Sequence, residues 1–146
     1  MPRGTSANNP STYLQKIIED KGMVSIRNLT KAKINTAFLK RSAEEMLRKE
    51  RRLGDVSIVL VQPKKSRELN MRYRGKDYAA NVLTFPIPEL GLGEIVICPQ
   101  KVRANAKEYG IKKERAMKLM VFHGVLHLLG YGHGAIAAKE EAYLFA

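Results

Sequence analysis

The segment from Leu119 to His133 constrains the fold most, because it is apolar on every side up to Leu129 and carries all three histidines of the chain. A helix that is apolar all round lies buried in the middle of a domain. His123 and His127 are four residues apart and share a helical face, so their imidazoles can bind one ion. Gly130 permits a left-handed turn after the helix, and we expect His133 to approach from the loop that follows.

This spacing is typical of a catalytic zinc site. Three neutral imidazoles leave a fourth position open for water, whose pKa falls toward about 7 when zinc binds it. We therefore predict one Zn²⁺ held by His123, His127 and His133, in a site that hydrolyses its substrate. Two alternatives stay open: hydrogen-bonded core histidines without a metal, and a structural zinc with Cys98 as the fourth ligand.

The rest of the chain predicts an α/β (α+β) fold, a mixed four-stranded sheet packed with about five helices around the buried metal-binding helix. Strands are expected at residues 24–29, 56–61, 82–85 and 94–98. Helices are expected at residues 30–51, 66–73, 100–108, 112–129 and 135–145, the first with Thr30 as its N-cap. The core face of that first helix should consist of Ile34, Phe38, Ala43, Met46 and Leu47. At 146 residues we expect a single hydrolase domain at 23–146, preceded by a disordered or short helical extension at 1–22.

The charge balance indicates a polyanionic partner. The chain has 26 Lys and Arg against 14 Asp and Glu, a formal charge of +12. Cations cluster between Lys64 and Lys76 and again between Lys112 and Lys118, as contacts to phosphates require. The alternative is that the charge only keeps the protein soluble.

The single cysteine and the hydropathy pattern indicate the compartment. Cys98 has no second cysteine to form an internal disulfide with, which is typical of a reducing cytosol. No apolar run approaches the roughly 20 residues that span a bilayer, and the N-terminus lacks the pattern of a signal peptide. We expect a cytoplasmic protein with no membrane partner.

The histidine spacing is similar to the zinc-binding pattern of metzincin peptidases, with one contradiction. Those enzymes need a glutamate directly after the first histidine as general base, and this chain has Gly124 there. A metallopeptidase is therefore a minor alternative.

Four blocks in order resemble the YbeY family of endoribonucleases and rRNA maturation factors. They are LNMRYRGKD at 69–77, NVLTFP at 81–86, LGEIVI at 92–97 and HGVLHLLGYGH at 123–133. The resemblance covers about Met23 to Tyr143 and implies a zincin-like fold, zinc on the three histidines, and a role in maturing the end of small-subunit ribosomal RNA. It also implies that Arg74 is the functional arginine. The family usually has Asp just before the third histidine, where this chain has Gly132, so a carboxylate behind the ligands is missing.

The leading hypothesis is a zinc-dependent, single-strand-specific endoribonuclease of rRNA maturation and ribosome biogenesis, with Arg74 and His123 as catalytic residues. Ribosomal RNA is the expected partner, and ribosomal proteins are further candidates. The alternatives are a non-catalytic ribosome assembly factor with a structural zinc, and the metallopeptidase. The acids Asp77, Glu94 and Glu140 are scattered in the sequence, so no general base can be assigned, and Asp77 is expected to be a turn or N-cap residue.

Overall fold

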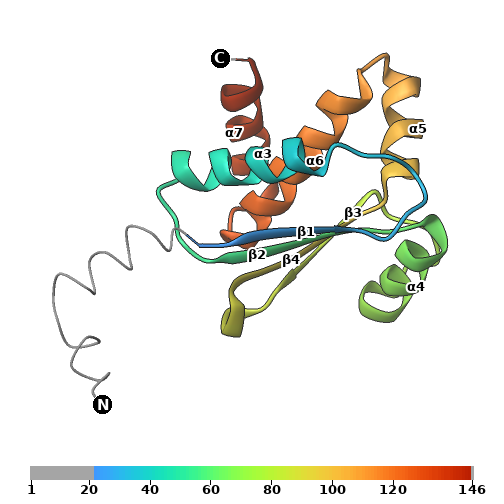
Figure 1. Ribbon diagram of the computed structural model, residues 1–146, viewed down its shortest axis with the longest axis horizontal. Coiled ribbons are helices and arrows are strands. Elements are labelled where there is room, and N and C mark those ends of the chain that lie inside the picture. The colour runs from blue at the N-terminus through green and yellow to red at the C-terminus, as the bar shows by residue number, and fades with distance from the viewer. Residues whose placement is uncertain (1–21, 146) are drawn as a thin grey trace, which may run out of the picture.

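The sheet is mixed and four-stranded, as predicted (Figure 1). The structure, a computed structural model, describes residues 22–145. The strands are β1 (Val24–Asn28), β2 (Asp55–Leu60), β3 (Val82–Pro86) and β4 (Gly91–Ile97), in the spatial order β1-β2-β4-β3. β2 pairs in parallel with β1 and β4, and β3 pairs antiparallel with β4 at the edge. The apolar, β-branched β2 lies inside the sheet, where both of its faces are covered.

Five α-helices surround this sheet in the described part of the chain. They are α3 (Thr36–Lys49), α4 (Pro63–Arg74), α5 (Pro99–Tyr109), α6 (Lys113–Leu128) and α7 (His133–Phe145), with a turn of 3-10 helix, η1 (Pro88–Leu90). Helices α3, α5, α6 and α7 lie on one side of the sheet, and α4 lies at the opposite side (Figure 1). None of these helices is long and apolar enough to cross a bilayer.

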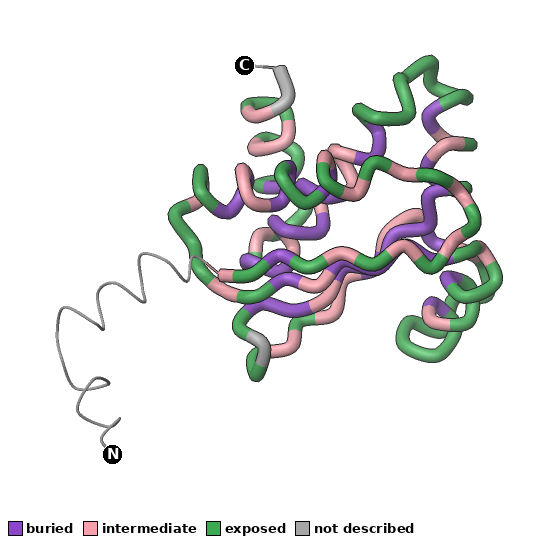
Figure 2. Tube along the Cα trace, viewed as in Figure 1, coloured by how far each residue is buried: buried purple, intermediate pink, exposed green. Residues whose placement is uncertain are grey.

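The strands bury both faces because successive side chains point in opposite directions. In β2, Ile58 and Leu60 belong to the large core under α3 and α6, whereas Val59 belongs to a smaller cluster on the face of α4. The predicted buried helix is α6, in which Phe122 and Val125 are completely buried. Buried residues gather where the helices meet the sheet (Figure 2). The fold class expected from the sequence is therefore confirmed.

The first long helix begins later than predicted. Thr30 is not its N-cap, because the side chain of Asn28 accepts hydrogen bonds from both the amide and the hydroxyl of Thr30 and holds it in a turn. The cap is Asn35, whose side chain accepts from the amide of Phe38 at 3.0 Å. Of the expected core face, Ala43, Met46 and Leu47 are buried, while Ile34 and Phe38 are only partly buried, and Leu39 takes a buried place that was not predicted.

The predictions for the N-terminus lie outside the described residues. The extension expected at 1–22 falls there except for Gly22, and so does the Tyr13–Glu19 segment that has a helical pattern.

Candidate functional site

Helix α6 brings two of the predicted ligands together. His123 and His127 are half-buried, and their Nε2 atoms lie 3.1 Å apart, with ring centroids at 4.6 Å. Two nitrogen ligands at about 2.1 Å from a tetrahedral zinc are separated by about 3.4 Å. The pair therefore fits two corners of a zinc site with little movement.

The turn after α6 has the predicted left-handed glycine. Gly130 has φ +97°, and the amides of Gly130 and Tyr131 donate to the carbonyls of His127 and Leu126, which forms a Schellman motif. The chain thus reverses within a few residues of the second histidine.

The prediction that His133 lies in a loop is wrong, because His133 is the first residue of α7. The Gly132 carbonyl already accepts from the amide of Ile136 at 2.9 Å, so the next helix starts as soon as the turn ends. The exposed ring of His133 packs edge to face on His127, with centroids 5.1 Å apart. As the side chains lie, no three His, Cys, Asp or Glu residues between 22 and 145 are gathered closely enough to hold a metal. For His133 to bind the same metal ion as a third ligand, its exposed side chain has to adopt another rotamer.

The electrostatic environment keeps His127 uncharged. Burial lowers the pKa of His127, the neighbouring His123 and His133 lower it further, and Arg74 adds to this against the opposing effect of Glu140. A metal ligand must be a neutral imidazole, so a lowered pKa favours binding at neutral pH.

The positive charge of Arg74 is the smallest of the influences that lower the pKa of His127. Arg74 is the last residue of α4 and is exposed, and Gly75 ends the helix with φ +67°. The helix therefore begins three residues before the expected 66–73 and ends one residue after it.

Glu140 was assigned no role from the sequence, yet it lies behind the histidine pair. Its Oε2 is 3.4 Å from His123 Nδ1, and its side chain is only 16% exposed. The contact is within ion-pair distance but lacks hydrogen-bond geometry, so this buried oxygen has no hydrogen-bond partner among the described residues. The available signal was helical spacing, because Glu140 follows His133 by seven residues and so shares its face of α7.

The other acids do not join the site. Asp77 pairs with Arg67 at 2.7 Å, and this hydrogen bond lowers the pKa of the Asp77 carboxyl. Glu94 accepts from the hydroxyl of Ser57 at 3.3 Å. Cys98 is buried at the end of β4, and it is not part of a metal-holding group within residues 22–145.

Gly124 faces the sheet. A Cβ at this position would lie 2.7 Å from Cγ2 of Ile95 on β4, closer than side chains approach one another. The close packing of α6 on β4 therefore requires glycine here. A peptidase-type glutamate at this position would have to displace Ile95.

A second carboxylate missed from the sequence connects the elements around the site. Glu50 follows α3, and its side chain is 4% exposed. It accepts hydrogen bonds from the Tyr131 hydroxyl at 2.6 Å, from the Tyr143 hydroxyl and from Lys139 Nζ at 3.1 Å. Glu50 thus fixes the turn before His133, and α7 with it, to the end of α3.

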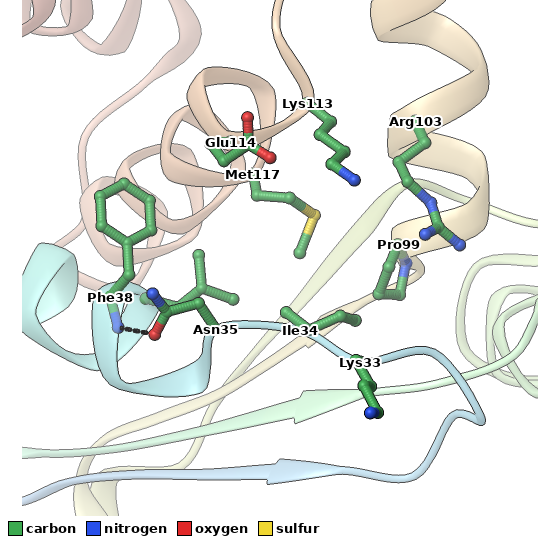
Figure 3. A pocket seen from close by; sticks show the side chains of 10 residues that line it. Lys33, Ile34, Asn35, Phe38, Pro99, Arg103, Lys113, Glu114 and Met117 are labelled. Atoms are coloured by element: carbon green, nitrogen blue, oxygen red, sulfur yellow. Dashed lines mark hydrogen bonds between the residues drawn. The ribbon is translucent and has the colours of Figure 1, made fainter.

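A separate cavity of about 140 Å³ lies between α3, α5 and α6 (Figure 3). Lys33, Arg103 and Lys113 line it together with apolar side chains such as Met117. It contains none of the predicted site residues.

Relatives found by comparison with known proteins carry the same family name. The family model described as endoribonuclease YbeY matches residues 17–145. Relatives named endoribonuclease YbeY include one from Thermotoga neapolitana, 39% identical over 76% of this chain and 74% of its own length. Another, from Bdellovibrio bacteriovorus, is 40% identical over 66% of this chain and 65% of its own length.

A solved structure agrees with the sequence relatives. The solution structure of the Thermotoga maritima protein TM1509 superimposes with a TM-score of 0.62 at 34% identity, covering 83% of this chain and 86% of that one. Sequence blocks, fold and relatives therefore agree that the chain belongs to the YbeY family of endoribonucleases.

Proposed function

We propose that this protein is a zinc-dependent, single-strand-specific endoribonuclease that matures ribosomal RNA, chiefly at the small-subunit end. The observation that carries the proposal is the pair of imidazole nitrogens of His123 and His127, 3.1 Å apart on one face of α6. The names of the relatives and the surplus of cations support RNA as the substrate.

His123 and His127 would hold the metal through Nε2, and His133 would complete the set. Zinc at such a site supplies Lewis-acid polarisation of a phosphoryl oxygen and a water of lowered pKa. If His123 carries its proton on Nδ1, facing Glu140, its Nε2 lone pair is free for binding. In the metal-free protein the short contact between the two Nε2 atoms then requires the proton to sit on His127 Nε2.

Arg74 would bind the phosphate that is cut. Its planar guanidinium makes paired hydrogen bonds to phosphate oxygens and stays charged at any working pH. Its charge also offsets the negative charge that develops on the phosphoryl oxygens.

Cleavage assays on three substrates test the proposal. A ribosomal RNA precursor with an unprocessed small-subunit end, a duplex RNA and casein are each incubated with protein, with and without a chelator. We expect cleavage of the unpaired RNA alone, lost with chelator and restored by zinc. Arg74→Ala should lower the rate about 100-fold or more while the zinc content stays unchanged. Arg41→Ala, an exposed arginine of α3, is the matched control.

His127→Ala separates the alternatives. The proposal expects a folded, zinc-poor and inactive protein with an unchanged circular dichroism spectrum. A protein that loses its fold on this substitution, with no RNA cleavage by the wild type, indicates an assembly factor braced by zinc. Cleavage of casein alone indicates a peptidase.

A further inference from the structure

The end of α4 and the loop after it expose apolar side chains that the fold does not use. Met71, Tyr73 and Tyr78 are 47%, 60% and 52% exposed, and they lie within eight residues of one another. Met71 and Tyr73 are two residues apart on a helix and so face different sides of it, whereas Tyr73 lies on the side of Asn70, which holds the loop of Tyr78. Exposed large side chains such as these two tyrosines, close together at one end of a helix, indicate an interaction surface.

The same stretch carries cations that have no acidic partner. Between Lys64 and Tyr78 there are two acids, and both are paired, Glu68 with Lys65 and Asp77 with Arg67. No ion pair or hydrogen bond from a described side chain engages the remaining cations, which are Lys64, Arg72, Arg74 and Lys76. Their charge is available to an anionic partner.

Buried polar residues hold the loop against the helix. Asn70, which is completely buried, donates from Nδ2 to the carbonyl of Tyr78 at 2.9 Å. The Ser66 hydroxyl bonds to both the carbonyl and the amide of Ala80, at 2.7 and 2.9 Å. Tyr78 is therefore fixed beside the helical turn that carries Tyr73.

The ring of Tyr73 is oriented by the sheet. It contacts Phe85 of β3 at a centroid distance of 5.2 Å and an interplanar angle of 69°. Most of the side chain stays in solvent, so a ligand meets a ring that is already ordered. An ordered aromatic surface loses less conformational entropy when it binds.

We propose that Tyr73 and Tyr78, with Arg74 and Lys76, form a stacking surface for unpaired nucleotides of single-stranded RNA. Bases stack on the two tyrosines, and the cations neutralise the phosphates between them. Duplex RNA hides its base faces, so the surface selects unpaired RNA. The inference rests on the proposed function and adds how that site recognises its substrate.

Binding of a fluorescent oligouridine of about eight nucleotides to the full chain tests this surface, measured by anisotropy without added metal. Tyr73→Ala should weaken binding by about 5- to 100-fold, since a single stacked base contributes in this range. Tyr73→Phe keeps the ring and should bind like the wild type. Tyr109→Ala removes another exposed tyrosine, 73% exposed on α5, and should have no effect.

An abasic oligomer of the same length gives the sharpest control, because it keeps the phosphates and lacks the bases. Its affinity should not depend on Tyr73. Equal loss of affinity for both oligomers, an unchanged Tyr73→Ala affinity, or full competition by an acidic peptide overturns the proposal. If Tyr73→Ala loses oligouridine binding and the wild type cuts no RNA, the stacking surface is supported and the proposed activity is rejected. If the wild type cuts RNA and its binding does not depend on Tyr73, the proposed activity is supported and the stacking surface is rejected.

Discussion

Glu140 supplies a carboxylate near the histidines, which Gly132 cannot supply. The family resemblance implies an Asp beside the third histidine, and this chain has an exposed glycine there. The carboxylate of Glu140 instead reaches His123 from α7, with its Oε2 3.4 Å from Nδ1. A carboxylate behind a histidine ligand fixes the tautomer and the ring orientation. A carboxylate is therefore present behind the histidine pair, although residue 132 is glycine.

Replacing Glu140 by Ala should weaken zinc binding by about 10- to 100-fold. Competition with a chromophoric chelator measures this affinity. Glu141→Ala, the exposed neighbour on the same helix, is the control and should bind zinc like the wild type. Nitrogen NMR of His123 in the metal-free protein at about pH 8, where histidine is neutral, should show a proton on Nδ1 that the Ala variant no longer fixes. An unchanged tautomer in that variant contradicts this role.

Residues on one helix were the predictable part of the site. The spacing of His123 and His127 depends only on helical periodicity, which the sequence displays. The contact of Glu140 with His123 depends on how α7 packs on α6, and no local pattern encodes that packing. His133 was assigned to a loop because its two neighbouring glycines favour turns, yet the helix begins directly at His133.

At the scale of elements, one carboxylate joins α3 to α7. Burial disfavours the charged form of Glu50, but the hydrogen bonds from Tyr131, Tyr143 and Lys139 outweigh it and lower its pKa. A lowered folded-state pKa means that the ionised group stabilises the protein above its unfolded pKa. This stabilisation is lost as the pH falls through the folded value.

Glu50→Gln should therefore cost about 1–3 kcal/mol of unfolding free energy at neutral pH, because a buried charge-assisted network loses its centre. The difference from the wild type should shrink below about pH 4.3, the ordinary glutamate pKa, as Glu50 itself becomes protonated. Urea unfolding at a series of pH values measures both. A difference that stays constant from pH 7 to the acid range would show that the charge of Glu50 is not what stabilises the contact.

The ends of helices and strands are predictable where a single glycine or proline determines the boundary. Gly75 and Gly110 end α4 and α5 in left-handed conformations, as glycines after a helix do. Thr30 is not a cap because its hydroxyl accepts from the amide of Ala32 within a local turn and no helix follows there. Pro63 ends a strand and also begins α4, since proline suits the first helical turn.

For the whole molecule, the surplus of cations predicts a salt-dependent affinity for RNA. With four unpaired cations on α4 and the loop after it, the logarithm of the affinity for single-stranded RNA should fall with the logarithm of salt concentration at a slope of about −3. Arg72→Ala should reduce this slope by about 0.7, while Arg41→Ala leaves it unchanged. Anisotropy titrations from low to physiological salt measure the slopes. A slope near zero would mean that the charge does not contact phosphates.

The sheet order marks the limit of sequence reasoning at this scale. Strand positions follow from local patterns, and the connection between β3 and β4 is too short for a parallel crossover, so these two strands pair antiparallel. The order β1-β2-β4-β3, which makes β3 the edge strand, depends on pairing between distant segments.

The absence of a side chain at Gly124 limits how this scaffold can be redesigned. At Gly124 the metal-binding helix packs so closely on the central sheet that there is no room for one extra carbon, so the helix cannot shift relative to the strand. Introducing a proteolytic base at Gly124 would first require replacing Ile95 by a smaller residue, which would disrupt the core that positions the histidines. Chemistry that needs another proton acceptor has to recruit it from a neighbouring segment or from the bound polynucleotide itself.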